Sequence, residues 1–81
     1  MDALRIEIDR NYDSFQRSLG KLLRDHRGQY ALMKSARIVE YFETPGEAYR
    51  QGLARYPDRI FSIQQVSEQP TELGMMSVAV R

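Results

Sequence analysis

The chain has 81 residues, of which 42% are hydrophobic and 28% are charged, a size and composition that fit one globular domain and exclude two. A formal net charge of +1 gives no indication of nucleic acid by itself, and the lack of cysteine excludes disulfides, thiol nucleophiles and cysteine-based metal sites. We therefore expect a single domain over residues 1–81. No apolar run has the length of a signal peptide or a membrane span, so we expect this domain in the cytoplasm.

The first predicted element is an amphipathic helix over residues 9–26, followed by Gly28 at a position where a positive φ is common. Residues 1–8 are ambiguous, because apolar and charged residues alternate there as in a strand, while Ile8 also continues the helical stripe. We favour a short strand or an N-terminal arm for this stretch. The helical stripe consists of Tyr12, Phe15, Leu19, Leu22, Leu23 and His26, spaced by three and four residues.

A β-hairpin is predicted next, with strands over residues 29–34 and 37–43 that are rich in β-branched and aromatic residues. Only Ser35 and Ala36 separate the two strands. That length fits a tight hairpin turn, but neither residue type favours the positive φ that such turns require.

The clearest helix start in the chain lies at Thr44, which can cap a helix whose first residue is Pro45 and whose third is Glu47. We expect this helix to end near Tyr56. Residues 60–66 then predict a strand with Phe61 and Ile63 on one face, and residues 73–80 predict a fourth, C-terminal strand.

The order of elements is therefore helix, β-hairpin, crossover helix, strand and C-terminal strand, which defines an α+β fold. The strands within 37–66 are joined by a helix, so we expect them to run parallel. The sequence thus predicts a mixed sheet of three to four strands with both helices on one face.

A series of motifs between residues 11 and 66 occurs in one order along the chain. They are Asn11-Tyr12 with Phe15, Leu22-Leu23, His26-Arg27-Gly28-Gln29-Tyr30-Ala31-Leu32, Glu40-Tyr41-Phe42-Glu43-Thr44, Glu47-Ala48-Tyr49, Gly52 and Phe61-Ser62-Ile63-Gln64-Gln65-Val66. In these motifs the chain resembles a family of short bacterial proteins of unknown function. It departs from the resemblance at Ser35-Ala36, where we would expect a glycine-containing turn. The resemblance implies a compact α/β module and no established activity.

Residues capable of catalysis are few and widely spaced. His26 is the sole histidine, has no partner at metal-ligand spacing, and is expected to pack at the end of the helical stripe. Glu40 is expected to face solvent, and Glu47 is engaged by the helix cap. We therefore expect no enzyme, no metal and no cofactor.

A cluster of cations is the one electrostatic feature of interest. Its first three members lie at i, i+4 and i+7 on the first helix, and the stretch between residues 16 and 37 contains a single acid, Asp25. Two interpretations are open, namely contact with phosphates or an acidic partner, and an ordinary solvated helix face. The cluster consists of Arg17, Lys21, Arg24, Arg27, Lys34 and Arg37.

The leading functional hypothesis is a small non-catalytic protein-interaction module or accessory subunit, binding another protein or itself as a homo-oligomer, and not a membrane. The alternative is a nucleic-acid-binding module that uses the basic face of the first helix. The apolar C-terminal stretch predicts a pairing edge for the first hypothesis, formed by Met75, Met76, Val78 and Val80.

Overall fold

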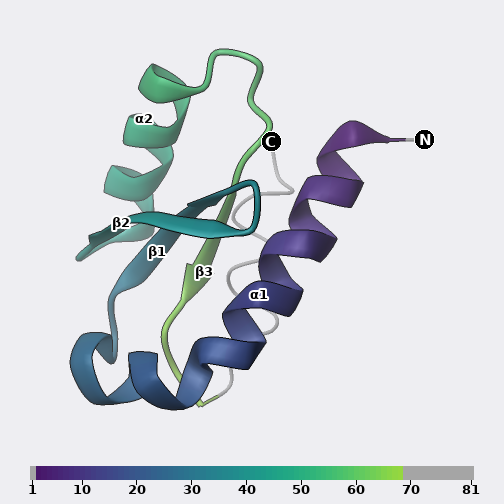
Figure 1. The fold of residues 1–81 in the computed structure, drawn as a ribbon. Helices are drawn as coiled ribbons and strands as arrows, with labels where there is room; N and C mark the ends of the chain where they lie inside the picture. The colour runs from purple at the N-terminus through teal and green to yellow at the C-terminus, as the bar shows by residue number, and fades with distance from the viewer. Residues whose placement is uncertain (1, 69–81) are drawn as a thin grey trace.

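The computed structural model describes residues 2–68 and contains two helices and three strands (Figure 1). In chain order these are α1 (Ala3–His26), β1 (Tyr30–Lys34), β2 (Arg37–Phe42), α2 (Pro45–Arg55) and β3 (Ser62–Gln65). The α+β prediction is confirmed. The predicted strand 73–80, with its pairing edge, lies outside the described residues. No helix between residues 2 and 68 is both long enough and apolar enough for a membrane crossing.

Helix α1 begins at Ala3, six residues before its predicted start. Asp2 has an extended backbone and its Oδ1 atom accepts a hydrogen bond from the Leu4 N–H at 3.1 Å, which caps the helix. The prediction of a strand or arm for residues 1–8 is therefore wrong for residues 3–8, which belong to α1. Ile8 is half-buried against the core cluster that contains Leu32 and Phe61, whereas Phe15 and Leu22 further along α1 belong to the other cluster.

The strands form one sheet in the order β2-β1-β3, and both ladders are antiparallel. Since β2 and β3 each run antiparallel to β1, they run parallel to one another, as predicted from the helix that joins them. The central β1 separates them, however, so no parallel ladder forms. The sheet of residues 2–68 is antiparallel and not mixed.

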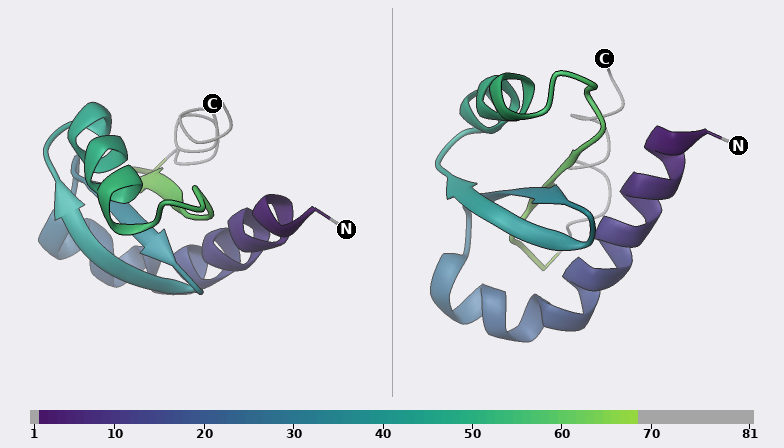
Figure 2. Two further views of the ribbon diagram at one scale, coloured as in Figure 1. Left: turned by 90° about the horizontal axis from the view of Figure 1, so that it is seen from above. Right: turned by 45° about the horizontal axis from the view of Figure 1, so that its top comes forward.

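The two helices cover opposite faces of this sheet (Figure 2), so the prediction that both lie on one face is wrong. Ala31 and Met33 of β1 pack with Phe15 of α1, whereas Leu32 packs with Ala48 of α2. Successive strand residues point to opposite faces, so β1 is buried on both sides. The sequence indicates this arrangement, because Ala31, Leu32 and Met33 are three consecutive apolar residues. A strand with one face in solvent would have a polar residue at every second position.

The hairpin turn adopts the left-handed conformation at both of its residues, with φ of 54° at Ser35 and 66° at Ala36. This conformation costs an L-residue roughly 1–2 kcal/mol. Side chains of α1 hold it in place: Glu7 accepts from the Ser35 N–H at 2.7 Å, and Asn11 accepts from the Ala36 N–H at 2.6 Å. The Ser14 hydroxyl donates to the Ala36 carbonyl at 2.8 Å. A turn with unfavourable residues is thus stabilised from another element.

Helix α2 starts as predicted, because the Thr44 hydroxyl accepts from the Glu47 N–H at 3.2 Å and Pro45 is the first helical residue. The helix lies close to the sheet at Gly52, which is buried against the ring of Phe61. Phe61 and Ile63 share the α2 face of the sheet, as predicted.

Candidate binding surfaces

Four exposed cations form a line along the outer face of α1. Arg17, Lys21 and Arg24 belong to the predicted cluster, and Arg10, seven residues before Arg17, joins them. At about 100° per residue, the four positions fall within an arc of roughly 60°. The line from residue 10 to residue 24 is about 21 Å long at 1.5 Å per residue. We call these four residues the cation stripe.

Acidic residues lie close to the cation stripe, since Asp13 and Asp25 are each within one turn of two of its members, and Arg17 is ion-paired. Arg17 forms an ion pair with Asp13 at 2.9 Å, one turn away on the same helix, with the two side chains 77% and 63% exposed. Such exposed pairs at i, i+4 contribute about 0.3–0.5 kcal/mol, so this pairing is easily exchanged for another anion.

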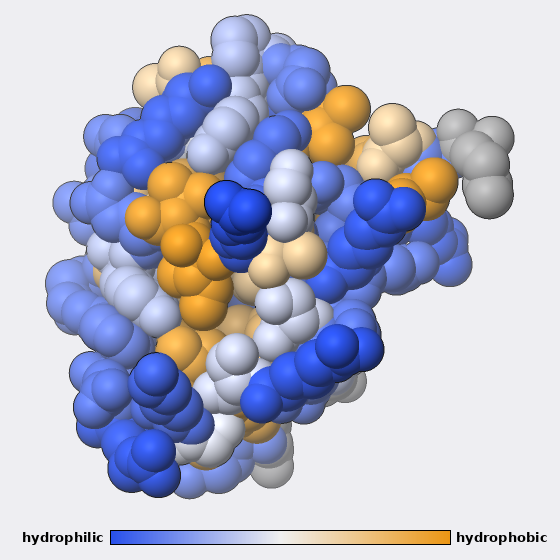
Figure 3. All heavy atoms as spheres, in the orientation of Figure 1, coloured by the Kyte–Doolittle hydropathy of each residue, from blue (hydrophilic) through white to orange (hydrophobic). Residues whose placement is uncertain are grey.

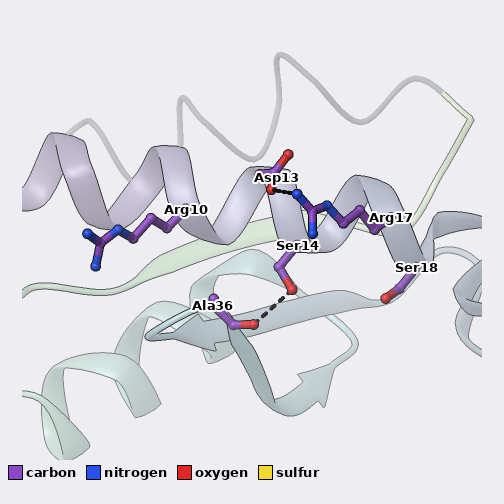
Figure 4. A pocket seen from close by; sticks show the side chains of 6 residues that line it. All are labelled: Arg10, Asp13, Ser14, Arg17, Ser18 and Ala36. Carbon is purple, nitrogen blue, oxygen red and sulfur yellow. Dashed lines mark hydrogen bonds and ion pairs between the residues drawn. The ribbon is translucent and has the colours of Figure 1, made fainter.

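A hollow of about 400 Å³ lies beside the stripe, between α1 and the hairpin turn (Figure 4). Figure 4 shows Arg10 and Arg17 two turns apart, with the Ser14 side chain directed at the Ala36 carbonyl between them. The lining includes two arginines and two serines, which can donate hydrogen bonds to an anion, and Figure 4 shows the Arg10 guanidinium at the end of the hollow farthest from Ser18. Its residues are Arg10, Asp13, Ser14, Arg17, Ser18 and Ala36.

The other predicted cations do not extend the stripe. The Arg27 guanidinium is bonded to Glu68. Lys34 is only 23% exposed, lies 3.7 Å from Asp58 and sits 5.0 Å above the Tyr56 ring, on the α2 side of the sheet. Arg37 is exposed beside the hairpin turn, opposite Lys34 in the ladder.

The outer side of β2 is a second exposed surface, which we call the β2 edge (Ile38, Val39 and Tyr41). In residues 2–68 no strand pairs with this side of β2. The register passes from Met33↔Ile38 to Leu32↔Glu40, which leaves Val39 as the extra residue of a bulge. Val39 is 38% exposed and is the large hydrophobic residue that stands out within the described chain. Figure 3 shows hydrophobic side chains gathered on this side of the molecule.

The β2 edge also offers backbone groups, because every second residue of an antiparallel edge strand directs its N–H and C=O groups away from the ladder. Ile38 and Tyr41 are half-buried because their side chains pack against the core on the α1 side of the sheet. Glu40 is bonded to Arg55 of α2, which fixes one charge next to the bulge. The bulge and the neighbouring charges oppose long, flat pairing of the kind that leads to aggregation.

His26 packs at the end of α1, as predicted. Its ring stacks on Tyr41 with centroids 3.6 Å apart and 6° between planes, and its Nδ1 atom is 2.8 Å from the Gln29 Oε1 atom. Gln29 donates in turn to Glu43 at 2.8 Å. Burial, and then the charge of Asp25, raise the pKa of the Tyr41 hydroxyl. No three His, Asp or Glu side chains of residues 2–68 are placed to hold a metal ion together.

Sequence reasoning did not find Arg10, Val39 or the buried Asn11. Arg10 had a signal, its spacing of seven residues from Arg17. No sequence signal indicated that Val39 would be exposed, because its neighbours predict a regular strand. The bulge at Val39 follows from the pairing of β2 with β1. Asn11 had no such signal either, since its role depends on a turn 25 residues further on.

Comparison of the chain with protein-family models, with curated proteins and with solved structures finds no match. No relative therefore assigns a role to any residue, and the resemblance to a family of short bacterial proteins stays a prediction. The functional argument depends on the two surfaces themselves.

Proposed function

We propose that this protein is a small non-catalytic interaction module that binds an extended, apolar segment of a partner protein along the β2 edge. The observation that carries the proposal is Val39, an exposed hydrophobic residue at a bulge of an edge strand. Addition of a strand to a sheet edge gains affinity from main-chain hydrogen bonds and specificity from the side chains beside them, and the bulge at Val39 confines such pairing to a short segment.

The chemistry of the edge supports an apolar partner segment. Ile38 and Tyr41 are half-buried against the core on the α1 side, so an apolar side chain laid across the bulge would meet Val39 and whatever part of Ile38 and Tyr41 stays exposed. Arg37 is an exposed cation at the start of this strand, whereas the charge of Glu40, next to Val39, is already paired with Arg55. Full burial of a valine contributes about 1.5–3 kcal/mol, so the part still exposed would add only a fraction of that and the affinity would be moderate.

A non-catalytic role is supported by how the polar residues are used. His26 stacks on Tyr41 and is bonded to Gln29, while Glu40 is bonded to Arg55. General acid-base catalysis needs a titratable group within reach of a substrate in a cleft. The hollow beside α1 is lined by guanidinium and hydroxyl groups with one carboxylate, Asp13, which is paired with Arg17.

The test compares Val39→Asp with Val39→Thr, a control that keeps the β-branched shape. Tagged full-length chains are used to capture proteins from the cell of origin, and light scattering at micromolar concentration gives the oligomeric state. We expect one partner to be retained by the wild type and by Val39→Thr and lost by Val39→Asp, with unchanged far-ultraviolet circular dichroism.

Identical capture by Val39→Asp and wild type would refute the β2 edge as the docking surface. A dimer that dissociates only in Val39→Asp would confirm that the β2 edge is the docking surface. It would also show that the partner is a second copy of this chain and not another protein.

A further inference from the structure

We infer that α1 carries a binding surface separate from the β2 edge, and that the cation stripe with its adjoining hollow holds the sugar-phosphate backbone of a nucleic acid without reading its bases. Two observations lead to this inference. One is the alignment of four exposed cations on one helix face, and the other is the hollow beside them, whose lining shares Arg10 and Arg17 with the stripe and adds Ser18.

The dimensions fit a phosphate backbone. One strand of a duplex advances about 3.4 Å per phosphate along the duplex axis, and its winding places successive phosphates farther apart than that, so a stripe of about 21 Å lies alongside fewer than roughly six phosphates. The cations follow one another along the axis at about 10, 6 and 4.5 Å, and their long side chains can each reach a different phosphate. Ser18, with its exposed side chain at the hollow, adds a hydroxyl donor of the kind that contacts phosphate oxygens.

The aromatic residues of α1 explain why the contact would not involve bases. Phe15 is fully buried in the core and Tyr12 is half-buried, so neither offers a ring for stacking beside the cations. Binding through stacked bases needs such exposed rings. Recognition limited to phosphates gives register on the backbone but no sequence preference.

A nucleic acid fits this surface better than an acidic protein does. Protein interfaces are centred on apolar or aromatic anchors, with the charges at the rim. The exposed large hydrophobic residue in the described part of the chain is Val39, which lies on β2 and not on α1. The cation stripe, by contrast, is a line of charges and polar groups throughout.

Asp13 provides a sharp test, because it competes with phosphate for Arg17 at 2.9 Å. Asp13→Asn would release Arg17 without reversing any charge on the stripe. Binding by the stripe predicts that this change strengthens affinity, and a purely structural role for Arg17 predicts no effect on affinity.

Fluorescence anisotropy of the full chain with a labelled 20-base-pair DNA duplex, and with single-stranded DNA and RNA of that length, measures the binding. With up to four phosphates neutralised, the slope of log affinity against log salt should be about −3 to −4 for the duplex. We expect Asp13→Asn to bind several-fold more tightly, and Arg17→Glu with Lys21→Glu to lose about tenfold or more in affinity. A polyglutamate peptide, titrated as a competitor, represents the acidic-protein partner.

The matched control is Arg50→Glu with Arg59→Glu, two exposed residues in α2 and the loop that follows it. Both double variants lower the formal net charge from +1 by four, to −3. An unchanged affinity in the control supports the stripe, whereas an equal loss in both variants would show a general charge effect and overturn the inference. It is also overturned by absence of binding at low salt, by an unchanged affinity in Asp13→Asn, or by polyglutamate that binds as tightly as the nucleic acids.

Discussion

Substitution of alanine for glycine should have opposite effects in the two helices. Gly20 lies in α1 with nothing within 4 Å of the position that a Cβ atom would occupy. At Gly52 in α2, a Cβ atom would lie 2.5 Å from the Cε1 atom and 2.6 Å from the Cζ atom of Phe61. Both positions are helical, so the intrinsic preference of a helix for alanine is the same in each, and the surroundings decide the sign.

The magnitudes follow from the contacts. Alanine in a helix interior is favoured over glycine by about 1 kcal/mol, so Gly20→Ala should raise the free energy of unfolding by about that amount. At Gly52 the same gain is opposed by overpacking, which costs about 1–3 kcal/mol. The cost should lie near the upper limit, because Phe61 is 2% exposed and its ring is flanked by Tyr49 and Tyr56 at 6.0 and 6.2 Å. A net loss of about 2 kcal/mol is expected for Gly52→Ala.

Thermal unfolding followed by circular dichroism distinguishes the two variants. At about 4–8 °C per kcal/mol for a domain of this size, Gly20→Ala should melt about 4–8 °C above the wild type, and Gly52→Ala about 8–16 °C below it. Adding Phe61→Leu to Gly52→Ala should recover part of the loss, because the smaller side chain makes room for the Cβ atom. A Gly52→Ala protein as stable as the wild type would refute the close packing of α2 on the sheet.

Three further predictions concern the helix cap, the hairpin turn and Tyr41. Thr44→Ala should lower the free energy of unfolding by about 1 kcal/mol in urea titrations, and an unchanged midpoint would contradict the cap. Ala36→Gly should raise it by about 0.5–1 kcal/mol, since relief of the left-handed backbone exceeds the added chain entropy, and a lower melting temperature would contradict this. Burial and the charge of Asp25 raise the pKa of Tyr41 above the ordinary tyrosine value of about 10, so the unfolded chain loses this proton first and stability falls as the pH rises from about 10 toward the folded pKa. Tyr41→Phe should reduce that fall in denaturation experiments on either side of pH 10, and an identical pH dependence would contradict the raised pKa.

Features determined by neighbours in sequence were predictable. The start of α2 depends on a hydrogen bond between Thr44 and Glu47, three residues apart, and the sequence predicted it correctly. The stripe on α1 was also predictable in part, because helical periodicity alone aligns Arg17, Lys21 and Arg24.

Features determined by tertiary contacts were not predictable. The conformation of Ser35 and Ala36 depends on α1 side chains more than twenty residues away. The pairing of β1 with both other strands determines the face of the sheet on which each helix lies. It therefore also determines that Lys34 is separated from the cation stripe. Val39 became exposed through a bulge that a regular strand pattern conceals.

The contacts between α1 and the hairpin turn also bear on the order of folding. An isolated β-hairpin forms in about 1–10 μs when its turn residues favour closure. Here closure places two L-residues in an unfavourable conformation, and the compensating bond from the Ala36 N–H to Asn11 spans 25 residues. We therefore expect β1 and β2 to pair in the same step in which α1 docks, which makes a short-range hairpin kinetically dependent on a long-range contact. A change at Asn11 would then slow folding and not merely speed unfolding.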